Sequence, residues 1–119
     1  MQRTTTTQKT LQQCIQECHE CHASCLQTLQ YCIQQGGKHV ELDHIRLMQD
    51  CSQMCQMCED FMLRQSPLYA ALCTLCAQIC LRCAESCEKV DPNDAQMKAC
   101  AEHCHRCAQT CQQMSQGRA

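Results

Sequence analysis

The segment CTLCAQICLRCAESC, residues 73–87, places five cysteines at successive intervals of three, four, three and four residues. In an α-helix these intervals put side chains on one face, whereas a strand would require a period of two. Polar residues such as Gln78, Arg82 and Glu85 lie between the cysteines, as in a bundle helix with one buried stripe. The segment therefore predicts an amphipathic helix whose buried stripe consists of cysteine.

The same cysteine spacing recurs in three other segments, and a helix-breaking pair separates each segment from the next. A glycine pair that begins at Gly36 ends the first segment, because glycine readily adopts the left-handed conformation that closes a helix. Ser66 and Asp91 each set a capping side chain before a proline at the first helical position. We therefore expect helices over residues 10–34, 40–64, 67–89 and 92–116.

The helix pattern and the composition together predict the fold and its unusual core. Four amphipathic helices with short connections favour an all-α fold, an antiparallel up-down-up-down four-helix bundle, with residues 1–119 as one domain. The chain has 17 cysteines, one Phe, two Tyr and no Trp, so cysteine takes up much of the core. The candidate metal ligands along that core are Cys14, Cys18, Cys21, Cys25, Cys32, Cys51, Cys55, Cys58, Cys73, Cys76, Cys80, Cys83, Cys87, Cys100, Cys104, Cys107 and Cys111.

Charge and hydropathy exclude several classes of partner. The formal net charge is −2, and no basic run is present that would neutralise a phosphate backbone, so we expect no nucleic acid partner. No apolar stretch approaches the ~20 residues that span a bilayer, and the first residues lack the apolar segment of a secretory signal. We therefore expect no membrane association and a cytoplasmic location.

The cysteine pattern also argues against disulfide and thiol-redox roles. Disulfide scaffolds belong to oxidising compartments, and an odd number of cysteines leaves at least one unpaired. Cys-x-x-Cys occurs five times, but always inside a continuing helix and never at the strand-to-helix start that lowers a thiol pKa in thioredoxin-like folds. We therefore expect reduced thiols and no enzymatic activity.

Seven pairs with the spacing Cys-x-x-x-Cys favour Cu(I) as the bound metal. Residues four apart on a helix have Cβ atoms about 5–6 Å apart, so a small rotamer change lets two sulfurs hold one ion. Two-coordinate thiolate binding suits the soft Cu(I) ion, whereas structural zinc takes four tetrahedral ligands, mostly from loops. A metal-free core of thiols is the alternative that needs no ligand, but leucine or alanine would fill the same space without redox liability.

Charge balance sets the expected capacity. Two thiolates around one Cu(I) leave a buried negative charge, which bridging removes when each sulfur joins two ions. This predicts roughly one Cu(I) per cysteine, on the order of 15 to 20 ions per chain. A zinc or general thiol-metal buffer remains the alternative function.

Seven Cys-x-x-x-Cys pairs on four helices, over residues 11–114, resemble the cytosolic branch of the bacterial copper storage proteins. The resemblance implies a bundle that stores many Cu(I) ions through its cysteine pairs and assembles as a homotetramer of bundles. Two features depart from the pattern: the second helix has only three cysteines, and Cys32 stands seven residues after Cys25.

Antiparallel register gives the two ends of the core different chemistry. His44, Met48 and Met97 come near Cys32 and Cys87 at one end, where they could admit Cu(I), and we include all three among the candidate ligands. The alternative for these three is a plug of thioethers and a solvated histidine. The other histidines, His19, His22, His39, His103 and His105, are expected in the first connection or on the surface. The opposite end collects the apolar residues Leu11, Met62, Leu68, Tyr69, Leu72 and Met114.

Overall fold

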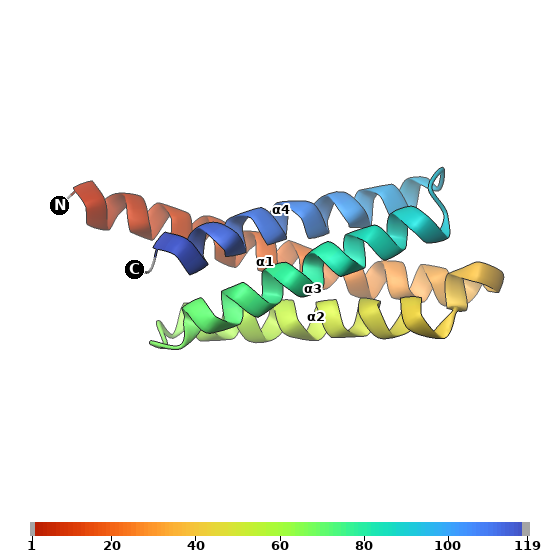
Figure 1. Cartoon of the computed structure of the whole chain (residues 1–119), viewed down its shortest axis with the longest axis horizontal. Helices are drawn as coiled ribbons and strands as arrows, with labels where there is room; N and C mark the ends of the chain where they lie inside the picture. Colours follow the sequence, from red (N-terminus) through yellow and green to blue (C-terminus); the bar gives the residue numbers. More distant parts are fainter. Residues whose placement is uncertain (1, 118–119) are drawn as a thin grey trace.

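The computed structural model describes residues 2–117, with side chains described over residues 8–116. Four helices run antiparallel to one another (Figure 1): α1 (Gln2–Gln35), α2 (Leu42–Leu63), α3 (Tyr69–Val90) and α4 (Ala95–Gly117). Each helix packs against its two neighbours in the order α1, α2, α3, α4 and back to α1. The predicted antiparallel four-helix bundle is confirmed.

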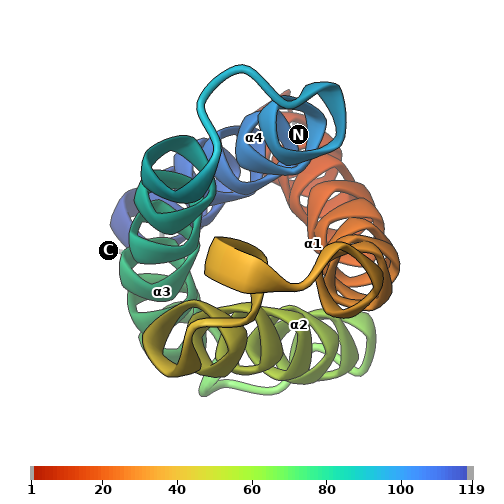
Figure 2. The ribbon, with the colours of Figure 1, turned by 90° about the vertical axis from the view of Figure 1, so that its right-hand side faces the viewer.

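A short 3-10 helix, η1 (Gly37–Val40), connects α1 to α2 and was not expected from the sequence. Viewed from the end that holds this connection, η1 lies across the middle of the ring of helices (Figure 2). The preceding Gly36 has φ +70°, a region that side chains rarely adopt, and its N–H donates to Cys32 O at 3.0 Å. The glycine pair therefore ends α1 as predicted and turns the chain over the end of the core.

The end of α2 uses the same positive-φ geometry without glycine. Gln65 has φ +53°, and the backbone N–H groups of Gln65 and Ser66 donate to Met62 O and Phe61 O at 3.0 Å each. These two bonds satisfy carbonyls that the last helical turn leaves free, in the pattern of a Schellman motif. Asn and Gly are the usual residues there, so a glutamine gives no signal in the sequence.

The predicted caps before the two prolines differ from those in the structure. Ser66 Oγ accepts the Leu68 N–H at 3.1 Å, so this serine closes a turn ahead of α3 instead of capping its first residue. Asp91 likewise lies in a turn, and Asp94 caps α4 by accepting the Met97 N–H on Oδ1 at 3.0 Å. Helices α3 and α4 start two and three residues later than predicted, because the proline occupies the turn. Of the other two helices, α1 starts at Gln2 and not at residue 10, and α2 starts at Leu42 and not at residue 40.

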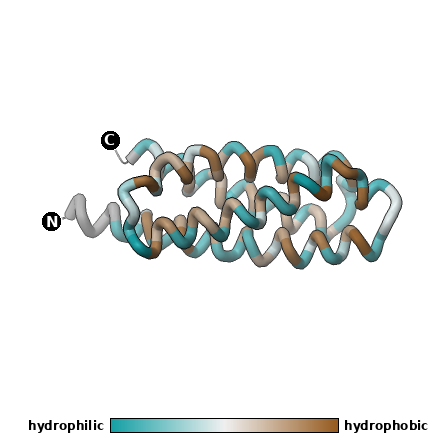
Figure 3. The backbone as a smooth tube through the Cα atoms, turned by 90° about the horizontal axis from the view of Figure 1, so that it is seen from below, coloured by the Kyte–Doolittle hydropathy of each residue, from teal (hydrophilic) through white to brown (hydrophobic). Residues whose placement is uncertain are grey.

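Cysteine fills the core along its length. All 17 cysteines are fully buried, together with Met48, Met62 and Met97. Four buried alanines, Ala77, Ala84, Ala101 and Ala108, belong to α3 and α4, where small side chains let two backbones approach closely. Hydrophobic and hydrophilic residues alternate in short stretches along every helix (Figure 3), as the stripe pattern predicts.

Among residues 2–117, α3 is long and apolar enough, by length and composition, to cross a membrane. The expectation that no stretch reaches this length was therefore wrong, because cysteine counts as apolar. In the bundle the five cysteines of α3 are buried, whereas Arg82, Glu85 and Glu88 are exposed on the other side. This division is that of a core helix with one polar face.

Candidate metal centre

The 17 thiols are free and form a nearly continuous array along the bundle axis. Near the termini, Cys14 Sγ lies 3.6 Å from Cys111 Sγ, and Cys107 Sγ lies 3.6 Å from Cys18 Sγ. Similar contacts continue through the centre as far as Cys25 and Cys100, whose sulfurs lie 4.0 Å apart. Each of these contacts joins two different helices, so the array exists only once the helices have packed.

Sulfur–sulfur contacts within one helix are a smaller part of the array than expected from the Cys-x-x-x-Cys pairs. Cys76 and Cys80, one of the seven Cys-x-x-x-Cys pairs, have sulfurs 3.8 Å apart. Both sulfurs also contact Cys55 on α2, at 3.9 and 3.7 Å. A metal ion at this pair is therefore within reach of sulfurs from two helices.

The sulfurs gather into groups of four with ligand atoms within 4.8 Å of one another. Every member is buried, and several cysteines belong to two groups. Such shared membership suits bridging thiolates, each of which binds two metal ions. Four such groups within the described part of the chain are Cys18/Cys58/Cys76/Cys111, Cys21/Cys25/Cys51/Cys104, Cys21/Cys51/Cys55/Cys80 and Cys55/Cys76/Cys80/Cys107.

Near η1, thioethers and imidazole take the place of some thiols. Cys32 Sγ lies 3.4 Å from His44 Nε2 and donates to Met97 Sδ at 3.6 Å. Met48 Sδ accepts from Cys83 and Cys87 at 3.5 and 3.7 Å. The structure thus brings together the set that the register predicted, and we call this end of the core the mouth.

His39, which was not expected among the ligands, is also part of the mouth. This residue lies on η1, is 4% exposed, and places Nδ1 3.4 Å from Cys32 Sγ. Its other nitrogen, Nε2, lies 2.9 Å from Asp91 Oδ2. A carboxylate on the second nitrogen orients a metal-binding imidazole, so His39 has the surroundings of a ligand. The signal was available, because antiparallel helices put the connections that hold His39 and Asp91 at the same end.

Burial keeps two groups at the mouth, Cys32 and His44, uncharged. Loss of solvent raises the pKa of Cys32 to about 11 and lowers the pKa of His44. At pH 7 the mouth therefore presents a protonated thiol, an uncharged imidazole and two thioethers. A cation that binds to the thiol must displace its proton.

His44 joins the core to a surface pocket. The pocket lies between η1, α2 and α3, and His44 forms part of its wall with Lys38, Glu41, Asp43, Ser86, Lys89 and Val90. His44 Nδ1 lies 2.7 Å from Ser86 Oγ, while Nε2 faces Cys32. The imidazole therefore lies between the pocket and a core thiol.

The opposite end of the core is apolar. Met62 and Met114 are 0% and 4% exposed, and Cys73 donates to Met62 Sδ at 3.9 Å. Leu11, Tyr69 and Leu72 pack against the buried residues as expected. Leu68, predicted to join them, is 61% exposed because the turn before α3 points it outward.

The remaining histidines lie outside the core, as expected. His19 contacts Glu59 and His105 contacts Glu88, at 3.3 and 3.1 Å. His22 Nδ1 lies 3.0 Å from Ser52 O, and His103 Nδ1 lies 3.2 Å from Arg106.

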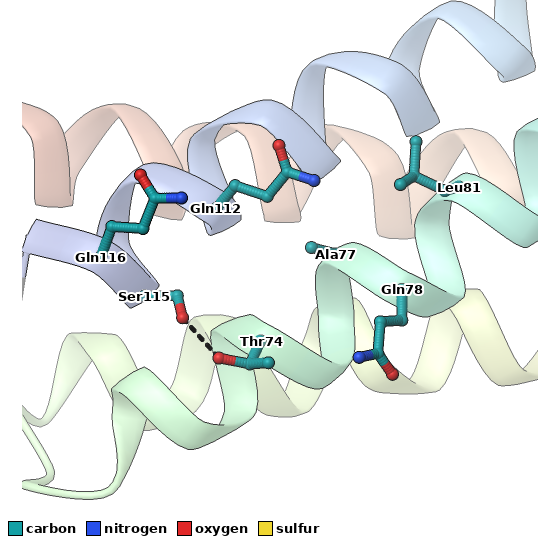
Figure 4. Close-up of a pocket in the computed structure, with 7 residues that line it drawn as sticks. All are labelled: Thr74, Ala77, Gln78, Leu81, Gln112, Ser115 and Gln116. Atoms are coloured by element: carbon teal, nitrogen blue, oxygen red, sulfur yellow. Dashed lines mark hydrogen bonds between the residues drawn. The ribbon is translucent and has the colours of Figure 1, made fainter.

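A groove between α3 and α4 has a different character from the core (Figure 4). The hydroxyl groups of Thr74 and Ser115 hydrogen-bond across it, and its other lining residues are Ala77, Gln78, Leu81, Gln112 and Gln116. Because its walls offer amides and hydroxyls and no sulfur, the groove is separate from the metal centre.

Two known proteins share both the fold and a substantial part of the sequence. The Nmul_A1745 protein from Nitrosospira multiformis is 40% identical, with a TM-score of 0.85 over 92% of this chain and 97% of that one. A structure described as Cu(I)-bound copper storage protein BsCsp3 is 31% identical, with a TM-score of 0.83 over 89% of this chain and 98% of that one.

A curated relative and a family profile agree with these structures. The cysteine-rich protein YhjQ of Bacillus subtilis (strain 168), described as uncharacterized, is 33% identical over 83 residues, which cover 70% of this chain and 77% of YhjQ. The sequence model described as copper storage protein matches residues 7–116, nearly the whole described chain. The chain belongs to the copper storage protein family.

Proposed function

We propose that this chain stores Cu(I), many ions at a time, and that it works in the cytoplasm without a catalytic role. The observation that carries the proposal is the array of 17 buried, free thiols whose sulfurs approach one another across helices. Sulfur is the ligand that Cu(I) prefers, and a reducing compartment keeps thiols available. Family membership and the copper-bound relative support the same function.

Charge explains why an interior of this kind suits a monovalent ion. Among residues 8–116, no Lys or Arg side chain is buried where it could balance the thiolates. One Cu(I) for each deprotonated cysteine makes the filled core nearly neutral, and the shared four-sulfur groups supply the bridging sulfurs that this ratio requires. The expected capacity is therefore on the order of 15 to 20 ions per chain.

The mouth supplies the means of loading. His44, Met48 and Met97 bind Cu(I) without adding negative charge, and thioether binding requires no loss of a proton. His39 extends this set, since its Nδ1 faces the same Cys32 thiol. We infer that ions are captured beside the pocket that reaches His44 and pass from there to the thiols.

Competitive titration distinguishes Cu(I) storage from a zinc or general thiol-metal buffer. Reduced, metal-free protein is titrated with Cu(I) and, separately, with Zn(II) against chelators of known affinity. Storage predicts a Cu(I) plateau near the number of cysteines and retention against a strong Cu(I) chelator. Equal filling by Zn(II), not displaced by Cu(I), would mean that the protein is a zinc buffer.

The exposed apolar residues support the proposed homotetramer. They include Leu26 and Ile33 on α1 and Leu75 and Leu81 on α3, all more than one third exposed. When copies of a bundle pack side by side, such apolar side chains are removed from water in the interface, which favours association. Light scattering on the eluting peak of a size-exclusion column tests this, and a monomer at micromolar concentration would contradict it.

A further inference from the structure

In two of the four-sulfur groups, the sulfur–sulfur distances around one cysteine are close to those of a tetrahedral metal site before any ion enters. A tetrahedral ion with metal–sulfur bonds of about 2.3 Å separates its sulfurs by about 3.8 Å. In one group, Cys55 Sγ lies 3.9, 3.7 and 3.8 Å from the sulfurs of Cys76, Cys80 and Cys107. A two-coordinate ion would instead hold its sulfurs up to about 4.6 Å apart. The metal-free spacing therefore matches four-coordinate binding.

A second group repeats this geometry on the mouth side of the first. Cys21 Sγ lies 3.9 Å from Cys51 and 3.8 Å from Cys104, and Cys104 Sγ lies 4.0 Å from Cys51 and from Cys25. Three helices supply these four sulfurs, so the packed bundle fixes their positions without loops.

Overlap between the groups limits how many can be filled at once. Cys21 and Cys51 each belong to two of the four groups, as do Cys55, Cys76 and Cys80. Of the four groups, at most two have no cysteine in common, for example Cys18/Cys58/Cys76/Cys111 with Cys21/Cys25/Cys51/Cys104. Two of these four groups can therefore be filled at once, although the chain has 17 thiols.

We propose that the copper-free core binds two divalent ions of the zinc group, Zn(II) or Cd(II), each held by four cysteine sulfurs, and releases them when Cu(I) arrives. Binding of the divalent ions does not depend on the proposed storage function, whereas their release by Cu(I) rests on it. Binding of each divalent ion by four thiols releases four protons and leaves a site with charge −2. Four Cu(I) ions then replace one divalent ion on the same four thiolates, which leaves four copper ions, four thiolates and no net charge.

Neighbouring thiols reduce the cost of the buried charge but do not remove it. The Cys107 thiol donates to Cys18 at 3.6 Å, and the Cys100 thiol donates to Cys25 at 4.0 Å. Neither donor is a member of the two groups that contain Cys18 and Cys25 and share no cysteine. Because such S–H donors are weak and no Lys or Arg of the described side chains is buried in the core, each divalent site keeps an uncompensated charge. Cu(I) neutralises that charge, which is why it displaces the divalent ion.

The test uses Cd(II), whose thiolate complexes absorb in the ultraviolet. Reduced, metal-free protein is titrated with Cd(II) under nitrogen, and the bound metal is counted after desalting. Wild type is expected to reach a plateau at two ions. Cys51→Ala removes two groups and leaves two that share Cys76, while Cys76→Ala leaves two that share Cys21 and Cys51, so each variant should bind one ion.

The double variant gives the sharpest comparison. Cys51→Ala with Cys76→Ala destroys all four groups and should bind no ion in this way, although 15 of the 17 thiols remain. The control, Cys32→Ala with Cys87→Ala, also removes two thiols but touches none of the four groups, so it should still bind two. Cu(I) capacity should fall by a similar small amount in both double variants.

Several results would overturn the proposal. These are a wild-type plateau that tracks the total number of thiols, a Cys51/Cys76 double variant that binds as much Cd(II) as the control, or retention of Cd(II) after Cu(I) is added. If far-ultraviolet circular dichroism shows that the double variant does not fold, the two single variants provide the test. A fall from two bound Cd(II) ions to one in each single variant supports the proposal, and an unchanged two ions contradicts it. Normal Cu(I) loading with no Cd(II) binding would refute this inference and leave copper storage intact.

Discussion

His39 Nε2 lies 2.9 Å from Asp91 Oδ2 and thereby joins η1 to the connection between α3 and α4. Lys38 Nζ adds a second contact to the same carboxylate, at 3.6 Å. The His39 and Tyr31 rings pack in a T-shaped arrangement, with ring centroids 5.8 Å apart. These contacts hold a short, otherwise weakly anchored helix across the mouth (Figure 2).

Replacement of Asp91 by Ala should free η1. The loss of one charge-assisted hydrogen bond costs about 2 kcal/mol, which corresponds to a roughly thirty-fold increase in local opening. Hydrogen exchange read by mass spectrometry should show faster exchange over residues 37–41 and unchanged exchange in the middle of α3. Asp43→Ala, at an exposed residue near the start of α2, is the control. Equal exchange in the two variants would show that Asp91 does not hold η1.

Changes at the mouth should slow loading without emptying the store. His44→Ala, Met48→Leu and Met97→Leu together remove one imidazole and two thioethers and leave every thiol in place. We expect a slower rate of Cu(I) uptake in stopped-flow experiments, because the neutral capture ligands are gone, and a nearly unchanged final copper content. Met62→Leu with Met114→Leu, at the apolar end, is the matched control. An unchanged rate in the mouth variant, or slower uptake only in the control, would disprove entrance through the mouth.

Removal of a single cysteine pair should reduce capacity by degrees. Cys76→Ala with Cys80→Ala takes away two of the 17 sulfurs, so copper content should fall by roughly two to four ions while the other thiols still fill. Copper counted per chain after desalting gives the answer. Loss of all binding in this variant would mean that the store is one indivisible cluster.

The reduced, metal-free chain should already be helical. The helix ends use backbone and side-chain bonds that need no metal, such as the Asp94 cap and the Gly36 turn. Copper then adds stability by binding the folded state. Far-ultraviolet circular dichroism of the reduced apoprotein should show a strongly helical spectrum, with a higher thermal midpoint after loading. A disordered spectrum that becomes helical only with copper would contradict this expectation.

The cap on α4 makes a separate prediction about stability. Asp94→Ala removes the acceptor for the Met97 N–H and should lower the free energy of unfolding by about 1 kcal/mol. Asp94→Asn keeps a capping oxygen and should stay close to wild type. Tyr31→Phe measures the contribution of the Tyr31 hydroxyl, which donates to the other oxygen of Asp94. Urea unfolding of the reduced apoprotein compares these three variants with wild type. An unchanged free energy of unfolding in Asp94→Ala would show that Asp94 does not cap α4.

The sequence was sufficient for the helices, their antiparallel register and the contents of the core. Periodic spacing decides which face of a helix is buried, and short connections decide which helices are neighbours. The register also placed His44, Met48 and Met97 beside Cys32 and Cys87, as the contacts show. The caps were less predictable, because Asp91 and Asp94 are three residues apart and only the path of the turn decides between them.

Which sulfurs meet, and in what numbers, was decided by the tertiary structure. A stripe gives the position of a thiol along its own helix, but Cys55 reaches Cys76, Cys80 and Cys107 only through the separations and rotations of three packed helices. His39 became part of the mouth for the same reason, since η1 crosses the end of the bundle to meet Asp91. Sequence spacing determines what one helix presents, and a metal site built from several helices depends on distances of a few tenths of an ångström that only their packing determines.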